Sequence, residues 1–513
     1  MSKGNPWREQ RFARAGLLGR RESRYPCPCY PGEHRRFRKT RPLTTFYIEQ
    51  FGCRATQADG AALERQLLER GCASVREARD ADIVVVNTCT VTASADAQAR
   101  DAIRRLHAAN PGVRVIVTGC YAQRAPEELR RLPGVAWVVG NSHKPQIPEL
   151  IERVSSRCEP SHANGFLPLS VLSPVTSSPS EPQAEILIGD IFAQQTLLTT
   201  PVFGGEGNHT RPTLKIQDGC NSRCAFCVIP FVRGKSRSLP ANTVIRELRK
   251  LSHSGYCEIV LSGINLGTYG RDLSPCVEFE DLLRRILDET TVGRLRISSI
   301  EPMDVTQDLV ELFASTERLA QHFHMPLQSG SDRILAVMHR WYRAGHYARR
   351  VELIRERLPH AAIGADVIAG FPGETEDDHA TTLGFIEALP FTYLHIFSYS
   401  KRPGTKAASL TNQVPGTVLK RRARELRALA ERKAAAFRQS QIGRELRVLT
   451  LHPSGESSSS RTPALSSNFL RLFIDGAFPS NQWLDVKATG REGAFVTAQV
   501  ADAEFGPSSP RRI

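Results

Sequence analysis

Three cysteines stand within eight residues of one another in this chain: Cys220, Cys224 and Cys227, in the spacing CxxxCxxC. Three thiolates this close together can bind three irons of one [4Fe–4S] cube and leave the fourth iron open. A structural zinc site would need a fourth Cys or His nearby, and no His lies within ten residues of the motif. The spacing therefore favours an iron–sulfur cluster over zinc or inert thiols.

Three further cysteines, Cys53, Cys89 and Cys120, each follow a segment with the apolar pattern of a strand. The expected strands alternate with helices in the order 45–48 (strand), 60–70 (helix), 83–87 (strand), 95–108 (helix) and 113–118 (strand). Such βα alternation predicts a parallel sheet, whose ligand sites lie at the carboxyl ends of the strands. The three cysteines should therefore converge at one edge. The alternative is that they are core cysteines without a ligand.

A second βα series follows, from about residue 213 to 409. The expected strands are 213–217, 258–262, 294–299, 322–326, 362–368 and 392–397, and the expected helices are 243–254, 279–289, 306–315, 345–357 and 376–388. Six parallel strands with intervening helices predict a partial or complete TIM-type barrel, whose site lies at the C-terminal mouth. The first strand would deliver Cys220, Cys224 and Cys227 to that mouth.

The end of the chain predicts a different architecture. Residues 417–442 contain no Gly or Pro and are rich in Arg, Lys, Ala and Leu, which predicts one long basic helix. Short expected strands follow at 445–451, 469–474, 483–488 and 495–500. They predict a small all-β module.

Length and charge limit the function classes. A chain of 513 residues suggests about three domains, and no apolar run is long enough to cross a bilayer. Residues 1–41 and 418–438 together account for the whole net charge of +15. Twelve cysteines without a secretion signal predict reduced thiols in the cytoplasm. Residues 1–43 are predicted to be a basic, disordered extension, or to result from a start codon placed too far upstream. An organellar transit segment is the alternative.

The CxxxCxxC motif, with Phe226 before its last cysteine, resembles the radical S-adenosylmethionine superfamily. The resemblance implies that the open iron of the cluster binds S-adenosylmethionine and that reductive cleavage gives a 5′-deoxyadenosyl radical. It also implies an electron donor such as flavodoxin or ferredoxin.

Over roughly residues 44–503 the chain resembles the methylthiotransferase branch of that superfamily. The matching segments are 52–54 (GCR), 87–92 (NTCTVT), 119–120 (GC), 229–230 (IP), 233–234 (RG), 237–238 (RS), 328–331 (QSGS) and 370–375 (GFPGET). The resemblance implies an α/β fold with an N-terminal domain (44–155), a linker or insertion (156–205), a radical core (206–436) and a TRAM-like RNA-binding barrel (439–503).

The same resemblance implies a second [4Fe–4S] cluster, held by Cys53, Cys89 and Cys120, that carries the transferred sulfur; the sulfur donor is unknown. By analogy, S-adenosylmethionine would be bound by residues at the barrel mouth: Ser262, Gly263, Ser298, Gln328, Asp366 and Gly370. Each of these could instead be a turn or packing residue.

The segments 87–92, 98–100 (QAR) and 103–105 (IRR) most resemble the branch that modifies threonylcarbamoyladenosine next to the tRNA anticodon. We therefore expect methylthiolation of C2 of N6-threonylcarbamoyladenosine at position 37, with the anticodon loop of tRNA as the partner. The alternatives are the same reaction on isopentenyladenosine or on a ribosomal-protein aspartate, and a non-catalytic RNA-binding protein with a structural metal.

Overall fold

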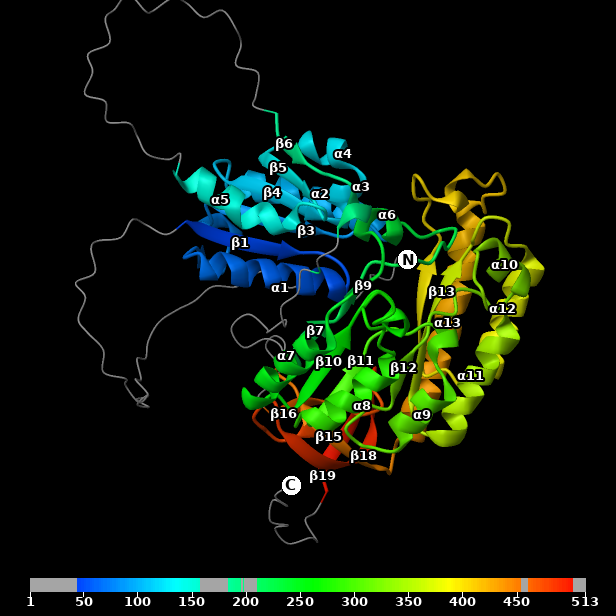
Figure 1. Ribbon diagram of the computed structural model, residues 1–513. Helices are drawn as coiled ribbons and strands as arrows, with labels where there is room; N and C mark the ends of the chain where they lie inside the picture. Colours follow the sequence, from blue (N-terminus) through cyan, green and yellow to red (C-terminus); the bar gives the residue numbers. More distant parts are fainter. Residues whose placement is uncertain (1–43, 157–182, 195–196, 198–209, 454–459, 502–513) are drawn as a thin grey trace, which may run out of the picture. The chain divides into compact units, whose positions relative to one another are not determined.

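The structure, a computed structural model, describes residues 44–156, 183–194, 197, 210–453 and 460–501 (Figure 1). The extension expected at 1–43 and most of the linker expected at 156–205 lie outside these residues. None of the helices in the described part of the chain combines the length and apolar character needed to cross a membrane.

The N-terminal domain is a six-stranded parallel sheet in the order β2-β1-β3-β4-β5-β6. Its elements are β1 (Thr45–Gln50), α1 (Arg54–Glu69), β2 (Ala73–Ser74), β3 (Ile83–Thr88), α2 (Ala93–Ala109), β4 (Arg114–Gly119), α3 (Cys120–Arg124), α4 (Pro126–Arg130), β5 (Val135–Gly140), α5 (Ile147–Ser156) and β6 (Glu185–Leu187). β6 comes from the segment expected to be a linker, and it extends the sheet beside β5.

The central strand β3 shows why this sheet is buried on both faces. Its apolar residues alternate between two cores: Val84 and Val86 pack with α2, and Ile83 and Val85 pack with α1 and α5. A strand that is covered on both faces needs a continuous apolar run, and the sequence supplies one.

The central domain is a curved row of six parallel strands. Two ladders, β7-β10-β11 and β12-β13-β14, are joined by single bridges such as that between Ser299 and His324. The elements are β7 (Thr213–Lys215), β8 (Gln217–Asp218), α6 (Ile229–Arg233), β9 (Arg237–Ser238), α7 (Ala241–His253), β10 (Glu258–Ser262), α8 (Phe279–Glu289), β11 (Arg294–Ile297), α9 (Gln307–Ala314), β12 (His322–His324), α10 (Asp332–Val337), α11 (Ala344–Arg357), β13 (Ala362–Ala369), α12 (Glu376–Ala388), β14 (Tyr393–Ser398) and α13 (Gly416–Ser440). No ladder joins the described residues of β7 to β14, so the expected partial barrel is confirmed.

The two faces of this barrel differ in character. Alternate strand residues such as Leu261, Leu295 and Phe323 pack outward in a large apolar core with the helices. The residues between them are mostly polar and point inward. They include Glu258, Ser262, Arg294, Arg296, His322, His324, Asp366, Tyr393 and His395. The period of two thus places a charged interior inside an apolar shell.

The C-terminal module is a closed five-stranded barrel in the order β15-β16-β17-β19-β18. Its strands are β15 (Glu445–Thr450), β16 (Arg461–Ser466), β17 (Arg471–Asp475), β18 (Trp483–Glu492) and β19 (Phe495–Val500). The sequence analysis missed β16. The barrel is fastened to the central domain because Arg294 Nη2 donates to the carbonyl of Leu465 and Arg296 Nη2 donates to that of Ser466, each over 3.0 Å.

Four of the eight Lys and Arg side chains on α13 form ion pairs with carboxylates. Arg421 pairs with Glu425 and Glu376, buried Arg422 pairs with Glu374, and Arg432 pairs with Glu387. The expected basic helix is therefore present, and carboxylates of α12 and of the residues just before it neutralise part of its positive charge.

Candidate functional site

The N-terminal cysteines lie at the carboxyl edge of three neighbouring strands. Cys53 precedes α1, Cys89 follows β3 directly, and Cys120 begins α3 directly after β4. Gly52 has a φ of +102°, and a Cβ placed there would lie 2.4 Å from Cys89 Cβ. Only glycine therefore allows the Cys53 loop to approach Cys89 this closely.

Electrostatics show that these three thiols form one group. Burial raises the pKa of Cys89 to about 11, and the neighbouring Cys120 and Cys53 add to the shift. Burial also raises the pKa of Cys120, while Arg233 and Lys144 oppose that shift. The nearby cations would stabilise thiolates, the form of cysteine that ligates iron.

A buried ion cluster, which we call the Asp59 cluster, lies beneath this group. It consists of Asp59, Lys144, Lys215, Asp218 and Arg233. Asp59 accepts from Lys144 Nζ over 3.0 Å, from Arg233 Nη2 over 3.1 Å, and from Lys215. Asp218 accepts from Lys215 over 2.9 Å and from Arg233 over 2.9 Å. Because Asp59 and Lys144 belong to the N-terminal domain and the others to the barrel domain, the cluster joins the two.

Its members also lie next to both cysteine sets in the chain or in space. Asp218 stands two residues before Cys220, and its Oδ1 accepts from the backbone of Gly219 over 2.8 Å. Arg233 donates to Thr56 Oγ1 over 3.3 Å, and Thr56 Oγ1 lies 3.7 Å from Cys53 Sγ. The Asp59 cluster therefore fixes the two cysteine sets relative to each other.

Cys220, Cys224 and Cys227 occupy the loop between β8 and α6, as expected. Gly219 has a φ of +74°, and a Cβ there would lie 2.0 Å from the carbonyl oxygen of Lys235. The backbone of Cys220 donates to Gly234 over 3.1 Å and that of Ala225 to Met338 over 2.9 Å. Contacts at both ends thus hold the loop in one conformation.

One of these sulfurs accepts a charged hydrogen bond. Arg340 Nη1 donates to Cys224 Sγ over 3.2 Å, and the same guanidinium pairs with Glu301. Burial raises the pKa of Cys224, and Arg340 opposes the shift. Burial also raises the pKa of Cys227 to about 12.

A cavity of about 190 Å³ lies between the two cysteine loops. Val91 and Thr92, which follow Cys89, line one side, and Cys227 lines the other. The remaining lining residues are Phe226, Val228, Ile229, Gln328, Asp366, Ile368, Phe397, Ser398, Tyr399 and Ser400. A mostly apolar cavity with a few polar groups is typical of a small-molecule site.

The structure brings some of the expected S-adenosylmethionine residues together at this cavity. Gln328 and Asp366 line it, and Gln328 has a φ of +68°, an uncommon conformation for a residue other than glycine. Its backbone donates to the Asp366 carbonyl over 2.7 Å.

The other expected residues lie elsewhere. Ser262 is buried at the end of β10, and the backbone of Gly263 donates to Ser298 Oγ over 3.3 Å. These three form a neighbouring part of the barrel mouth and are not among the residues that line the cavity. Gly370 packs against Leu419 of α13, and its backbone donates to the Glu374 carboxylate. Its position is that of a turn residue.

Sequence reasoning did not find Asp59, Lys144, Lys215 or Arg340. Their partners are far away in the chain, so spacing gives no sign of them. One signal was available: in the expected strands 294–299 and 322–326, Arg or His residues alternate with apolar ones, which indicates a polar barrel interior.

Both cysteine sets fit iron–sulfur clusters. Each offers three thiols without a disulfide, and Arg233 or Arg340 stands beside them to balance thiolate charge. Cys227 also borders the cavity, where an open iron could meet a ligand.

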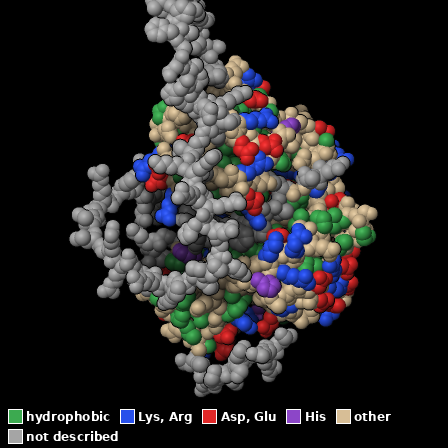
Figure 2. All heavy atoms as spheres, turned by 60° about the vertical axis from the view of Figure 1, so that its left-hand side comes forward, with side chains coloured by type: hydrophobic (Ala, Val, Ile, Leu, Met, Phe, Trp, Pro, Cys, Tyr) green, Lys and Arg blue, Asp and Glu red, His purple; other side chains and the backbone are tan. Residues whose placement is uncertain are grey.

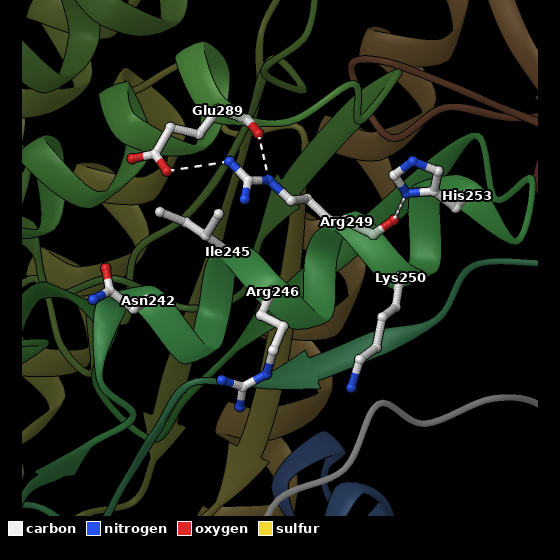
Figure 3. Close-up of a pocket in the computed structure, with 7 residues that line it drawn as sticks. All are labelled: Asn242, Ile245, Arg246, Arg249, Lys250, His253 and Glu289. Carbon is white, nitrogen blue, oxygen red and sulfur yellow. Dashed lines mark hydrogen bonds and ion pairs between the residues drawn. The ribbon is translucent and has the colours of Figure 1, made fainter.

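A second cavity, of about 430 Å³, lies on the outer face of α7. Figure 3 shows that its basic residues Arg246, Arg249, Lys250 and His253 all come from this helix, with Arg249 paired to Glu289 of α8. It contains no cysteine and is separate from the cluster sites. Figure 2 shows basic and acidic side chains interspersed over the described part of the face that it draws.

Comparisons with known proteins find similarity in both domains that carry the cysteine sets. Residues 45–140 match the profile described as "Uncharacterized protein family UPF0004", and residues 214–386 match that of the radical SAM superfamily. The chain is 37% identical over 405 residues to the threonylcarbamoyladenosine tRNA methylthiotransferase MtaB of Aquifex aeolicus, covering 79% of this chain and 92% of that protein. It is 34% identical over 436 residues to the tRNA-2-methylthio-N(6)-dimethylallyladenosine synthase of Syntrophobacter fumaroxidans, covering 84% and 90%.

Among solved structures, the chain resembles the radical S-adenosylmethionine methyltransferase TsrM of Kitasatospora setae. The TM-score is 0.52 at 15% identity, covering 71% of this chain and 74% of that one, so the likeness concerns the fold. The chain matches both family profiles and is more than 30% identical to these relatives over most of their length. It therefore belongs to the radical S-adenosylmethionine methylthiotransferase family.

Proposed function

We propose that this chain methylthiolates C2 of N6-threonylcarbamoyladenosine at position 37 of tRNA. The observation that carries the proposal is the cavity of about 190 Å³, because residues next to Cys89 and Cys227 itself line the same space. A base in this cavity would lie within reach of both cysteine sets. The names of the relatives from Aquifex aeolicus and Bacillus subtilis, the latter 36% identical over 397 residues, support threonylcarbamoyladenosine as the substrate.

Each cysteine set has its own role in this proposal. Cys220, Cys224 and Cys227 would hold the cluster that binds S-adenosylmethionine, and Cys53, Cys89 and Cys120 would hold a second one. With both [4Fe–4S] clusters and S-adenosylmethionine bound, the cofactors would supply the electron, the radical and the methylthio group. The electron would come from a donor of the flavodoxin or ferredoxin class.

The protein's own residues position the reactants and exclude water. Gln328 and Asp366 supply polar contacts in the cavity, while Phe226, Ile368 and Phe397 supply apolar walls. Water exclusion protects a radical from side reactions. A base in the anticodon loop is accessible without melting a helix, so its entry requires little unstacking.

The C-terminal barrel is proposed to bind the tRNA backbone. Lys487 and Arg491 are exposed on β18 and have no ion-pair partner among the described residues. Contacts of this kind recognise phosphates independently of sequence and weaken as salt rises.

The two cysteine sets can be tested separately with triple alanine variants. Replacing Cys220, Cys224 and Cys227 should abolish both 5′-deoxyadenosine formation and methylthiolation. Replacing Cys53, Cys89 and Cys120 should leave reductive cleavage of S-adenosylmethionine, remove methylthiolation, and halve the bound iron. Circular dichroism serves as the control for folding. Wild-type methylthiolation by the second, folded variant would refute the assignment.

The substrate itself can be tested by mass spectrometry of tRNA nucleosides from cells with and without the gene. Loss of the methylthio group from threonylcarbamoyladenosine alone supports the proposal. Loss from isopentenyladenosine instead would assign the chain to the other tRNA branch, and unchanged tRNA would point to a protein substrate.

A further inference from the structure

A group of polar side chains inside the barrel continues from the cavity. Asp366 Oδ1 lies 3.1 Å from His324 Nε2, and His324 Nδ1 lies 3.0 Å from the Tyr393 hydroxyl. The same hydroxyl lies 2.7 Å from His322 Nε2. The ring centroids of His324 and His395 are 5.5 Å apart. We call these five residues the interior polar cluster.

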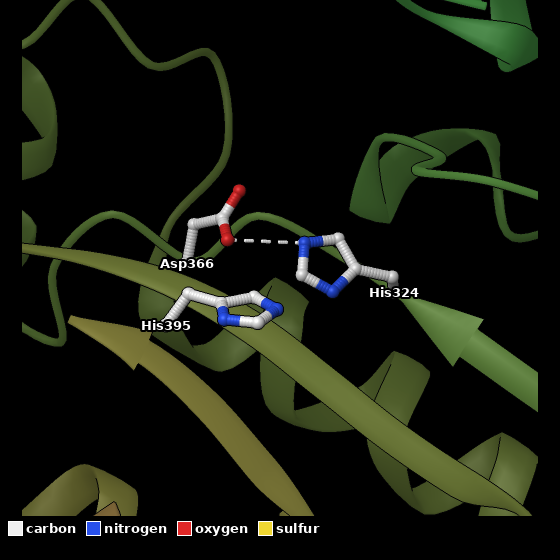
Figure 4. A group of neighbouring side chains, drawn as sticks. All are labelled: His324, Asp366 and His395. Atoms are coloured by element: carbon white, nitrogen blue, oxygen red, sulfur yellow. Dashed lines mark ion pairs between the residues drawn. The ribbon is translucent and has the colours of Figure 1, made fainter. Parts of the chain in front are cut away.

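Three strands contribute to this cluster. Figure 4 shows His324 from β12, Asp366 from β13 and His395 from β14 facing one another. His395 is exposed and Asp366 lines the cavity, so a molecule in the cavity can reach the cluster. His322, in contrast, is buried.

Arg54 extends this polar region on the side of the N-terminal domain. It follows Cys53 directly and is half-buried. Its charge is repelled by Arg211, which precedes β7, and by Arg296 of β11. Tyr393 of β14 and Glu258 of β10 are further electrostatic neighbours, and Glu258 attracts it. The guanidinium has no hydrogen-bond or ion-pair partner among the residues that the structure describes.

The surrounding charges leave Arg54 without a free counter-ion. Glu258 already pairs with Arg211, Arg294 and Arg296. Asp366 is engaged with His324. Both carboxylates are thus already engaged by other groups, and a half-buried cation without a partner favours an anionic ligand.

A metal ion is a less suitable occupant. His324, Asp366 and His395 could bring three ligand atoms within 4.8 Å of one another. However, both ring nitrogens of His324 already have partners, Asp366 and Tyr393. A metal would have to displace one of them and would not neutralise Arg54.

We propose that Arg54 binds the carboxylate of the N6 substituent of the substrate adenosine, while the interior polar cluster accommodates the rest of that substituent. The inference rests on the proposed function. A threonylcarbamoyl group carries a carboxylate, a hydroxyl and a urea, which match a guanidinium and hydrogen-bonding His and Tyr side chains. An isopentenyl group offers none of these and would leave the polar side chains unpaired.

The test measures binding of anticodon stem-loop RNA to the full chain, with position 37 carrying threonylcarbamoyladenosine, its methyl ester or isopentenyladenosine. Arg54→Ala should weaken binding of the first RNA roughly ten- to hundredfold, the range of a charged hydrogen bond. Esterification should weaken wild-type binding by a similar factor and have no effect on the variant. The isopentenyl RNA should bind both proteins equally well.

Arg65→Ala is the matched control, because Arg65 lies on the same helix with a side chain 48% exposed and paired with Glu69. It should bind all three RNAs as the wild type does. If Arg54→Ala does not fold, two other measurements test the inference. Arg54→Lys keeps the positive charge and should still bind the acid RNA, whereas the wild-type protein should bind the uncharged ester RNA more weakly.

Three results would overturn the inference. The first is equal wild-type affinity for acid and ester. The second is an equal loss for all three RNAs in Arg54→Ala, which would assign Arg54 to a phosphate. The third is a stoichiometric metal other than iron that His395→Ala removes. Failure of the proposed function is a different result: the loaded wild-type enzyme would not methylthiolate the threonylcarbamoyl RNA at all.

Discussion

The Asp59 cluster predicts a large loss of stability for a small chemical change. Asp59→Asn keeps the shape of the side chain and removes the buried carboxylate that pairs with Lys144, Lys215 and Arg233. Removing one partner from a buried ion pair costs about 3–5 kcal/mol. The cations lower the pKa of Asp59 from 3.8 to about 2. A lowered pKa means that the ionised carboxylate stabilises the folded state, in agreement with that cost.

We therefore expect Asp59→Asn to lower the free energy of unfolding by about 3 kcal/mol. The assay is urea unfolding of the metal-free protein, followed by circular dichroism. If the free energy of unfolding falls by about 3 kcal/mol per molar urea, the midpoint of the first unfolding transition should fall by roughly 1 M urea. Glu69→Gln is the matched control, because it makes the same carboxylate-to-amide change in an exposed pair on the same helix. It should change stability by less than about 0.5 kcal/mol.

The sign of the pH dependence follows from the lowered pKa of Asp59. Its contribution is fully present above the unfolded value of 3.8 and is lost as the pH falls toward about 2. The difference between the wild type and Asp59→Asn should therefore be constant from pH 5 to 8 and shrink below pH 4. Equal midpoints for Asp59→Asn and Glu69→Gln at pH 7 would refute this account of the cluster.

Three further predictions concern other parts of the chain. Gly52→Ala should lower the bound iron toward half, because its Cβ would lie 2.4 Å from Cys89 Cβ; Gly404→Ala, also at a positive φ but with open space around it, should keep full iron content. Arg340→Gln should lower the reduction potential of the cluster at Cys224, measured in a titration followed by electron paramagnetic resonance. It should also lower the free energy of unfolding by about 3 kcal/mol, because Glu301 loses its partner. An unchanged potential would contradict the role of the hydrogen bond. Truncation after Ser440 should destabilise the central domain, because Arg294 and Arg296 lose carbonyl acceptors. The double variant Lys487→Ala, Arg491→Ala should keep the stability of the central domain and reduce the slope of log K against log[salt] for tRNA binding by about two. Equal salt slopes for this variant and the wild type would argue against the RNA contact.

Much of the architecture could be predicted because its strands and helices have clear periodicity. The buried run Ile83–Thr88 and the strand Glu258–Ser262 are examples, and both lie where the sequence places them. The convergence of Cys53, Cys89 and Cys120 could be predicted because parallel strands end at a common edge of the sheet.

The elements that were missed have weaker local patterns or depend on distant partners. β16 contains Pro463, and its strand becomes evident only through its pairing with β15 and β17. β6 was predicted in part, since its three residues overlap the stretch 186–192, a candidate strand within a segment of linker composition; its bounds follow from pairing with β5. The Asp59 cluster could not be predicted because Lys215 is 156 residues away from Asp59 in the chain.

The two boundaries of the barrel domain should respond differently to sequence drift during evolution. At the C-terminal barrel, Arg294 and Arg296 donate to the main-chain carbonyls of Leu465, Ser466 and Ser467. Every residue type has a carbonyl, so that loop can change its side chains without losing these bonds. At the N-terminal domain, the side chain of Asp59 meets the side chains of Lys215 and Arg233 across the boundary. A substitution on one side there requires a compensating substitution on the other. An exchanged C-terminal barrel should therefore keep these carbonyl contacts, whereas an exchanged N-terminal domain should keep its contacts only if it retains a carboxylate at the position of Asp59.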